Sequence, residues 1–364
     1  MNRSIGHGWR GMLLFFLVLA TGTFGKIEAS PAQDQGDLRS VTLDGRQGLQ
    51  EVVISVKFLD RAAALYQDVA GWEMRARGEA APALAALWQV PGMRIEQVVL
   101  GAPSAAGGFV RLVKFDAKDP VRIRSSARAF DTGGIFNMNM LVRGIDDLFE
   151  DMHDRGCQGF SDPSGFGFAG NLYSGAMLRC HDDIVINLIE RLSGDYSDMA
   201  PFKAVSPITN STMIVPDFDN ARRFFVDQLG WQIRFESAVT WDEDGTNNFG
   251  LPNSLVIDGD VSAQAGSYIL GTTDEGGSLE ILAFDGLTGI DYSDRTAPPN
   301  RGLLMHSIHV PDLDSYLAAI SERGIPLHVD KALIQYPPYG PVQAAVIRSP
   351  AGSWMMLFEQ IALE

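Results

Sequence analysis

The chain contains an internal repeat, and this repeat constrains its fold more than any other feature of the sequence. The segment 51–72 aligns without a gap with the segment 210–231, at an offset of 159 residues. Asp60, Ala62, Asp68, Gly71 and Trp72 thereby meet Asp219, Ala221, Asp227, Gly230 and Trp231. A second pair, 137–156 and 305–324, aligns at an offset of 168. Such periodicity indicates a repeated supersecondary unit, so we expect two halves of about 150 residues, each made of two related modules.

Each module shows the same local pattern. An apolar run, such as Val52–Val56 or Ser307–Val310, predicts an opening strand. An aspartate follows at the expected start of a helix, where its carboxylate can accept hydrogen bonds from free backbone N–H groups. In the third module the helix carries an apolar stripe at Ala221, Phe224, Phe225 and Leu229. Glycines are expected to end the four helices, at Gly71, Gly156, Gly230 and Gly324. Three further strand-like runs complete each unit, which predicts β-α-β-β-β four times.

This pattern resembles the vicinal oxygen chelate superfamily, which includes glyoxalases, bleomycin-resistance proteins and extradiol dioxygenases. The resemblance lies in the Asp-Leu-Asp at the helix start of the fourth module, the Phe-Phe…Leu-Gly-Trp of the third, the Arg-Gly at helix ends, and the turn Ser349–Gly352. It covers roughly residues 47–362. It implies an α+β fold of four βαβββ modules paired into two glyoxalase-like domains, each a curled sheet around a cleft. We expect domain 1 at 47–195, with modules at about 47–118 and 132–192, and domain 2 at 204–362, with modules at about 204–287 and 300–362.

The N-terminus has the features of a secretory signal peptide. Arg3 and Arg10 precede the uncharged apolar run Met12–Ala20, and small and polar residues follow. We therefore expect a signal peptide at residues 1–29, a flexible linker at 30–46, and export to the periplasm or the extracellular space. Elsewhere the sequence shows no apolar run long enough to span a bilayer. A balance of 29 basic against 45 acidic residues argues against broad binding to nucleic acid.

The resemblance also implies positions for the ligands of one divalent metal, at the start of the first strand and within the last strand of each module. In the first half these positions hold Glu51, Arg111, Asn137 and Asn187. In the second half they hold Asn210, Glu280, Met305 and Met356. Tight metal sites need several converging imidazole, thiolate or carboxylate groups, and a guanidinium repels a cation. Neither half therefore predicts a complete metal site, and no cofactor is assigned.

Glu280 and His306 are an alternative pair of ligands for a divalent metal. The alignment places His309 on the cleft face of its strand and His306 behind it. A slip of one residue in the register would exchange the two histidines and bring His306 into the ligand position.

Without a metal, the same positions suit a small organic ligand. Glu51 and Glu280 are candidate general bases, and Arg111 can hold a carboxylate or enolate through paired hydrogen bonds. The candidate substrate-binding residues are Arg111, Asn137, Asn187, Asn210, Met305 and Met356. The alternative for the first half is that Glu51 and Arg111 neutralise each other on neighbouring strands.

Three classes of function remain open from the sequence. The first is a metal-free lyase or isomerase, and the second is a non-catalytic protein that sequesters a small molecule. The third is a metal-dependent glyoxalase or dioxygenase. The sequence does not decide whether the chain is an enzyme, and it names neither a substrate nor an oligomeric state.

The two cysteines, Cys157 and Cys180, both lie in the second module. Cys157 is expected at the start of one strand and Cys180 at the end of another, and in an antiparallel meander such positions lie side by side. Because an exported protein meets an oxidising compartment, we predict a disulfide between them, with two buried free thiols as the alternative.

Overall fold

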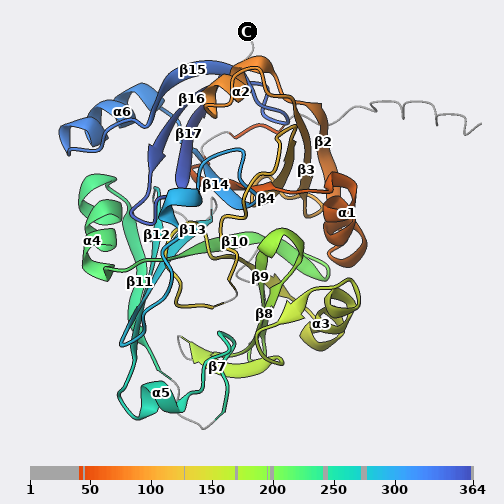
Figure 1. Ribbon diagram of the computed structural model, residues 1–364, viewed down its shortest axis with the longest axis vertical. Coiled ribbons are helices and arrows are strands. Elements are labelled where there is room, and N and C mark those ends of the chain that lie inside the picture. The colour runs from red at the N-terminus through yellow and green to blue at the C-terminus, as the bar shows by residue number, and fades with distance from the viewer. Residues whose placement is uncertain are drawn as a thin grey trace, which may run out of the picture. The chain divides into compact units, whose positions relative to one another are not determined.

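The order of elements repeats four times along the chain, as the sequence predicts (Figure 1). The computed structural model describes residues 41–43, 46–126, 128–168, 171–194, 196, 201–240, 245–271 and 277–361, all in one unit, Leu38–Glu364. The expected signal peptide and residues 30–40 of the expected linker lie outside the described residues. None of the helices within these described ranges has the length and apolar character that a membrane crossing requires.

The first two modules contain the following elements. Module 1 comprises β1 (Gly48–Ser55), α1 (Leu59–Ala64), its π-helical continuation η1 (Leu65–Val69), β2 (Glu73–Glu79), α2 (Pro82–Leu87), β3 (Ile95–Gly101) and β4 (Phe109–Phe115). Module 2 comprises β5 (Asn137–Val142), α3 (Ile145–Asp154), β6 (Gln158–Gly159), β7 (Ser164–Phe168), β8 (Asn171–Arg179), the 3-10 turn η2 (His181–Asp183) and β9 (Val185–Arg191).

The last two modules follow the same plan. Module 3 comprises β10 (Val205–Ile214), α4 (Phe218–Arg223), its π-helical continuation η3 (Phe224–Gln228), β11 (Gln232–Val239), α5 (Ser254–Ile257), β12 (Ser262–Ile269) and β13 (Ser278–Asp285). A short 3-10 turn, η5 (Ser293–Arg295), precedes module 4. Module 4 comprises β14 (Gly302–His309), α6 (Leu313–Glu322), β15 (Val329–Gln335), β16 (Pro341–Arg348) and β17 (Trp354–Gln360).

The helices end at the predicted glycines, but the predicted aspartate cap is present only at α4 and α6; α1 and α3 begin after Phe58 and Gly144, which provide no side-chain cap. The apolar stripe Ala221, Phe224, Phe225 and Leu229 is buried. The glycines after the helices, Gly71, Gly156, Gly230 and Gly324, have φ of 66°, 91°, 76° and 86°, a conformation that glycine adopts at little cost. Aspartate caps two of the helices: Asp217 accepts from the Asn220 N–H and Asp312 from the Ser315 N–H, each at 2.9 Å.

Each sheet combines one module from each half of the chain, which differs from the expected division into 47–195 and 204–362. Modules 1 and 4 form an eight-stranded sheet, in the order β15-β16-β17-β14-β1-β4-β3-β2. Modules 2 and 3 form a nine-stranded sheet, in the order β11-β12-β13-β10-β5-β9-β8-β6, with β7 paired to β8. We call these the 1–4 sheet and the 2–3 sheet. The physical reason is that all four modules open on an apolar strand, so local pattern does not determine which opening strands pair.

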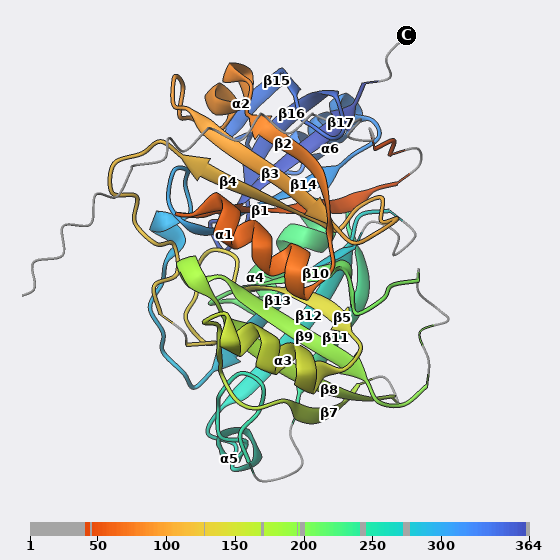
Figure 2. The same ribbon diagram turned by 90° about the vertical axis from the view of Figure 1, so that its right-hand side faces the viewer.

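The two sheets share one hydrophobic core. A single cluster of buried side chains takes Val52 from β1, Met138 from β5, Met213 from β10 and Ile308 from β14. Helical segments of neighbouring modules also meet: η1, which continues α1, contacts α3, and α1 and α3 both face the viewer in Figure 2. These contacts make modules of both sheets depend on each other for burial of their apolar faces.

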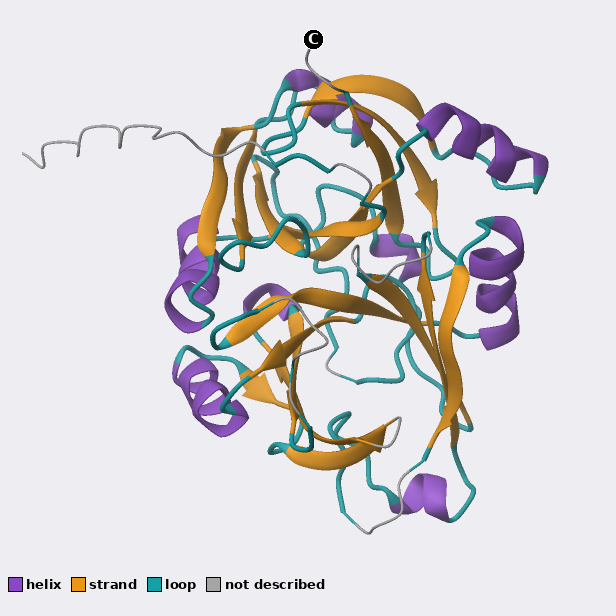
Figure 3. Ribbon diagram, turned by 180° about the vertical axis from the view of Figure 1, so that it is seen from behind, coloured by secondary structure: helices purple, strands orange, loops and turns teal. Residues whose placement is uncertain are grey.

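The opposite face of each sheet curls inward (Figure 3); we call it the inner face. On the 1–4 sheet this face is covered by a second buried cluster that includes Trp88, Tyr336, Tyr339, Trp354 and Phe358. On the 2–3 sheet the buried apolar set is smaller, comprising Ala129, Phe136, Met177, Val185, Ile214, Ala265 and Leu282. Partly buried aromatic side chains surround it, at Phe160, Phe235, Phe249 and Phe284. The inner face of the 2–3 sheet is therefore the less completely covered of the two.

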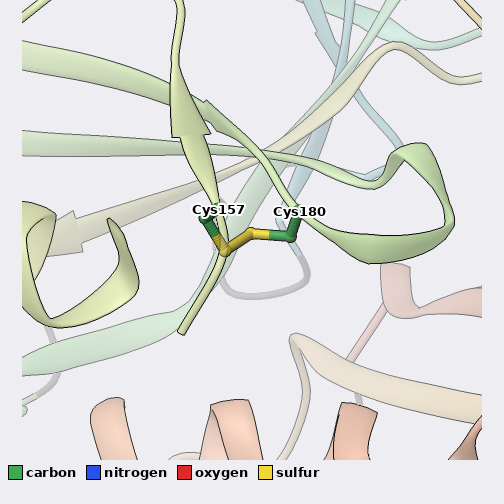
Figure 4. The surroundings of a disulfide bond; sticks show 2 residues. All are labelled: Cys157 and Cys180. Atoms are coloured by element: carbon green, nitrogen blue, oxygen red, sulfur yellow. A yellow bond between two sulfur atoms is a disulfide. The ribbon is translucent and has the colours of Figure 1, made fainter. Parts of the chain in front are cut away.

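Cys157 and Cys180 are joined by a disulfide bond (Figure 4), which confirms the prediction. The pairing of β6 with β8 places Gln158 opposite Arg179, so the residues just before and just after them are neighbours. Their Cα atoms lie 4.1 Å apart. The bond thus ties the segment after α3 to the end of β8.

Candidate functional site

The eight predicted site positions fall on the two inner faces in a new grouping. Because module 1 pairs with module 4, Glu51 and Arg111 share the 1–4 sheet with Met305 and Met356. Asn137, Asn187, Asn210 and Glu280 lie together on β5, β9, β10 and β13 of the 2–3 sheet. We expected each half of the chain to form its own site. Instead, each sheet carries one set of four predicted site positions.

On the 1–4 sheet, Glu51 and Arg111 form a fully buried ion pair. Arg111 Nε and Nη2 donate to the two carboxylate oxygens of Glu51 at 2.7 and 2.9 Å. Arg111 Nη1 donates to Gln97 Oε1 at 2.6 Å, and its Nη2 also donates to the Pro337 carbonyl at 2.5 Å. Tyr336 donates to Glu51 Oε2 at 2.8 Å, and its ring centroid lies 3.7 Å from Arg111 Cζ. Such bidentate pairing is the strongest geometry available to a guanidinium and a carboxylate.

This geometry matches the alternative given for the first half of the chain, in which Glu51 and Arg111 neutralise each other. Burial lowers the pKa of Arg111, but the negative charge of Glu51 outweighs it and raises that pKa above its ordinary value. The guanidinium therefore stays charged and paired with Glu51. Met305 and Met356 are likewise fully buried in the cluster with Trp354 and Tyr336. The 1–4 inner face accordingly has the organisation of a packed core.

On the 2–3 sheet, six polar residues occupy adjacent positions on four neighbouring strands. Cross-strand pairing aligns Glu280 with Thr212 and Thr212 with Asn137. It also aligns Asn210 with Asn139, and Asn139 with Asn187. We call this set the polar cluster: Asn137, Asn139, Asn187, Asn210, Thr212 and Glu280. Asn139 and Thr212 are not among the predicted site positions, although each lies two residues beyond one of them and so on the same face of its strand.

Asn139 lies at the centre of the polar cluster. Its Nδ2 group donates to Thr212 Oγ1 at 3.1 Å and to Glu280 Oε2 at 3.3 Å, and it also contacts Asn210 Oδ1. Thr212 donates to the same Glu280 oxygen at 2.8 Å, and Asn187 Nδ2 donates to Asn139 Oδ1 at 2.8 Å. A chain of hydrogen bonds therefore links all four strands.

Burial changes the acid–base properties of the Glu280 carboxyl group. Burial raises its pKa above the ordinary glutamate value, although hydrogen bonds from Thr212 and Asn139 and the charge of Arg234 oppose the shift. A carboxylate with a raised pKa is a stronger base than an ordinary one and exchanges its proton closer to neutral pH. Perturbed groups of this kind are enriched at functional sites.

Two acceptor atoms of the polar cluster have no partner among the described residues: Asn137 Oδ1 and Asn187 Oδ1. Both side chains are buried, and the nitrogen of Asn137 finds only the sulfur of Met177, at 3.8 Å. An unsatisfied buried acceptor costs about 1–3 kcal/mol. The two oxygens are thus available to a bound molecule that brings donors.

The histidines lie outside the polar cluster. His306 is buried, and its Nε2 lies 2.9 Å from Ser211 Oγ, whereas the next residue, Thr212, points to the opposite face of β10 and contacts Glu280. Burial lowers the pKa of His306 to about 3. The structure therefore does not bring His306 and Glu280 together as a metal pair. His309 lies on the inner face, where its Nδ1 contacts the Arg46 carbonyl at 2.5 Å and its ring packs on Phe358.

Neither set of residues fits the divalent metal that the resemblance implies. On the 1–4 sheet, the Arg111 guanidinium already supplies the positive charge that Glu51 faces. On the 2–3 sheet, the acceptors of Asn210, Thr212 and Glu280 are engaged by an amide N–H₂ donor from Asn139. Within the described ranges, no three His, Cys, Asp or Glu side chains gather in a way that could hold a metal ion.

Comparisons with known proteins identify the fold. No family model and no curated protein matches the sequence. Among solved structures, glyoxalase I from Zea mays matches with a TM-score of 0.58 and 15% identity, over 86% of this chain and 93% of that one. A proposed dioxygenase from Bacillus subtilis matches with a TM-score of 0.53 and 10% identity, over 89% of this chain and 87% of that one. The chain therefore has the fold seen in glyoxalase I, and the predicted fold class is confirmed.

Proposed function

We propose that this chain uses the vicinal oxygen chelate fold to bind a small organic molecule on the inner face of the 2–3 sheet, where Glu280 acts as a general base without a metal. The observation that carries the proposal is the polar cluster itself. It places a carboxyl group of raised pKa on the same sheet face as two buried amide oxygens that lack partners among the described residues. Apolar side chains beside the cluster, including Phe136, Met177 and Leu282, would receive the apolar part of the ligand.

The 2–3 sheet is preferred over the 1–4 sheet because of how their polar groups are satisfied. On the 1–4 sheet, Glu51 already accepts hydrogen bonds from Arg111 and Tyr336, and aromatic side chains cover the pair. A ligand there would have to break a buried bidentate ion pair, which costs several kcal/mol. On the 2–3 sheet, a ligand would instead satisfy acceptors that the protein leaves open.

The reaction that suits such a site is proton abstraction, as in an isomerase or a lyase. A positioned carboxylate contributes by taking a proton from the substrate in the transition state. The amide of Asn139 and the hydroxyl of Thr212 hold the Glu280 carboxylate in one orientation, which keeps the base aligned. They also leave one carboxylate oxygen, Oε1, without a hydrogen bond to these two residues.

Binding without turnover is the second candidate function. It is favoured by the hydrogen-bond chain from Asn187 through Asn139 to Glu280, because this chain holds these three side chains in a fixed arrangement. Such rigidity suits recognition as well as catalysis.

The decisive experiment combines a binding screen with isotope exchange. Small molecules that raise the melting temperature of the protein are incubated with it in D₂O, and NMR records exchange of their C–H protons. We expect exchange that Glu280→Gln abolishes and that Asp285→Asn, an exposed carboxylate on the same strand, leaves intact. Saturable binding without exchange identifies a sequestering protein. Binding that is unaffected by Glu280→Gln would place the site elsewhere and overturn the proposal.

We also propose that the mature protein is exported. The expected signal peptide at residues 1–29 lies outside the described residues, and the disulfide between Cys157 and Cys180 supports an oxidising destination. Intact mass and N-terminal sequence of the protein from cell fractions test this. A full-length cytoplasmic species with two free thiols would contradict it.

A further inference from the structure

The unpartnered atoms of the polar cluster are all of one chemical kind, and this determines what a ligand must present. Asn137 Oδ1 and Asn187 Oδ1 are hydrogen-bond acceptors without partners in the described part of the chain. Their side chains are 1% and 6% exposed, so bulk water does not readily satisfy them. A ligand that completes the cluster must therefore bring N–H or O–H donors.

The orientation of these amides follows from the carboxylate. An ionised carboxylate only accepts hydrogen bonds, so Asn139 must turn its Nδ2 towards Glu280. Its Oδ1 then faces Asn187, which must turn its own Nδ2 towards Asn139. The remaining oxygen, Asn187 Oδ1, is left facing away from this chain of bonds. Glu280 thus determines, through two amides, that the open position at β9 is an acceptor.

The two open acceptors lie within reach of one ligand group. Asn187 is opposite Asn139, which lies two residues from Asn137 on the same face of β5. Asn137 and Asn187 are therefore diagonal neighbours on adjacent strands, a separation that side chains and a small ligand group can bridge. Glu280 lies two strands away, level with Asn137 through Thr212.

The charge of Glu280 distinguishes between a neutral and a cationic donor group on the ligand. Glu280 is the carboxylate of the cluster, and the cation that acts on it is Arg234, which lies on β11 and is exposed. Solvent screens the charge of an exposed guanidinium, whereas a cation on the inner face would meet the carboxylate in a less polar environment. A carboxylate or phosphate ligand would face the Glu280 carboxylate and two open acceptors, which disfavour an anion.

We propose that the inner face of the 2–3 sheet recognises an organic ammonium, a protonated amine on an apolar body, with its N–H donors directed to Asn137 Oδ1 and Asn187 Oδ1 and its charge balanced by Glu280. The inference rests on the proposed function and names its ligand class. It places the apolar body against Phe136, Met177 and Leu282.

Three probes with one apolar body and different polar groups test the inference: benzylamine, benzyl alcohol and benzoate. Binding to the full chain is measured by isothermal titration calorimetry at pH 8, where the amine is protonated. We expect benzylamine to bind at least about tenfold more tightly than benzyl alcohol, and benzoate not to bind.

Asn137→Leu is the variant of choice, because it removes an unsatisfied acceptor and should leave the fold intact or stabilise it. We expect Asn137→Leu and Glu280→Gln each to weaken benzylamine binding at least about tenfold. Asp285→Asn removes an equal formal charge from an exposed position on the same strand and should leave binding unchanged.

The outcomes separate this inference from the proposed function. If benzoate or benzyl alcohol binds more tightly than benzylamine, and Glu280→Gln or Asn137→Leu alters that binding, the site stands and the ammonium is excluded. If benzylamine binds equally well to wild type and both variants, the ammonium is not recognised here, and the inference fails. If none of the three binds, the inference also fails, while the D₂O screen still decides the proposed function.

Discussion

At the residue scale, two side chains provide internally what a bound cation would provide. Arg111 donates to Glu51 and Gln97 on the 1–4 sheet, and Asn139 donates to Thr212 and Glu280 on the 2–3 sheet. The two differ in charge: a guanidinium neutralises its carboxylate, whereas an amide leaves its carboxylate with a net charge. The two inner faces therefore differ in the group that pairs with their carboxylate.

The Arg111–Glu51 pair yields the first prediction. Arg111→Gln would leave a buried carboxylate without its counter-charge, so we expect a loss of about 3–5 kcal/mol in the free energy of unfolding. Urea denaturation followed by tryptophan fluorescence measures the loss. The matched control is Arg77→Gln, which removes an exposed ion pair with Asp60 and should change little. Equal effects of the two substitutions would contradict a structural role for the buried pair.

The raised pKa of Glu280 yields the second prediction. The folded protein binds the Glu280 proton more tightly than the unfolded chain, so stability falls as pH rises from about 4.5 through the folded-state pKa. We expect Glu280→Gln to be relatively more stable than wild type at pH 7 than at pH 4. Parallel stability curves for the two proteins across this range would show that the carboxyl group is not desolvated.

At the scale of elements, strands of different modules are tied by a few polar contacts. Ser211 on β10 donates to the Asn137 carbonyl on β5, and the His306 ring on β14 contacts the same hydroxyl. Because Ser211 has one proton to donate, His306 must donate its Nε2–H to Ser211, so the neutral ring is the Nε2-protonated tautomer. The contact joins the 1–4 sheet to the 2–3 sheet.

Acid sensitivity follows from this histidine. Its folded-state pKa is lowered to about 3 by burial, so between pH 6.5 and 3 the unfolded chain binds a proton that the folded protein excludes. Stability is therefore lost as pH falls below 6.5, by roughly 1 kcal/mol per pH unit. His306→Gln keeps a donor for Ser211 and should remove this component. Thermal melts of wild type and His306→Gln, followed by circular dichroism at pH 4 and pH 7, measure this component. If both proteins show the same pH dependence of stability, the prediction is wrong.

The disulfide ties β6 to the end of β8 and gives a fourth prediction. Cys157→Ser with Cys180→Ser should lower the free energy of unfolding by about 3 kcal/mol, because the bond closes a loop in the unfolded chain. Denaturant titration of the oxidised wild type and the double variant tests this. Reduced wild type serves as the control and should match the variant; two titratable thiols in the denatured, unreduced protein would contradict the bond.

At the scale of the whole molecule, each sheet needs both halves of the chain. Module 1 must find module 4 across the full length of the sequence, whereas modules 2 and 3 are consecutive. The shared core between the sheets then links all four modules. The molecule is therefore expected to unfold as one cooperative unit.

A split of the chain tests this dependence. Residues 41–196 and 201–361, expressed separately, would each expose one unpaired opening strand of either sheet, so neither should show a cooperative thermal transition. Co-expression should restore both sheets and a single transition, seen by calorimetry. A half that folds cooperatively by itself would show that the modules of that half pair with each other.

The sequence by itself determined the local structure: apolar runs made the strands, Ala221 and Phe225 lie on the buried side of their helix, and Gly230 ends that helix because only glycine adopts its φ at little cost. It also determined which positions face inward, since side chains alternate along a strand. The tertiary structure decided which side chains contact each other. Glu280 lies in a cluster with Asn139 and Asn187, and Glu51 and Arg111 are sealed by Tyr336 from module 4. These contacts depend on which opening strands pair, and the paired strands are distant in sequence. Because the four modules share one short-range pattern, the local sequence does not determine that pairing.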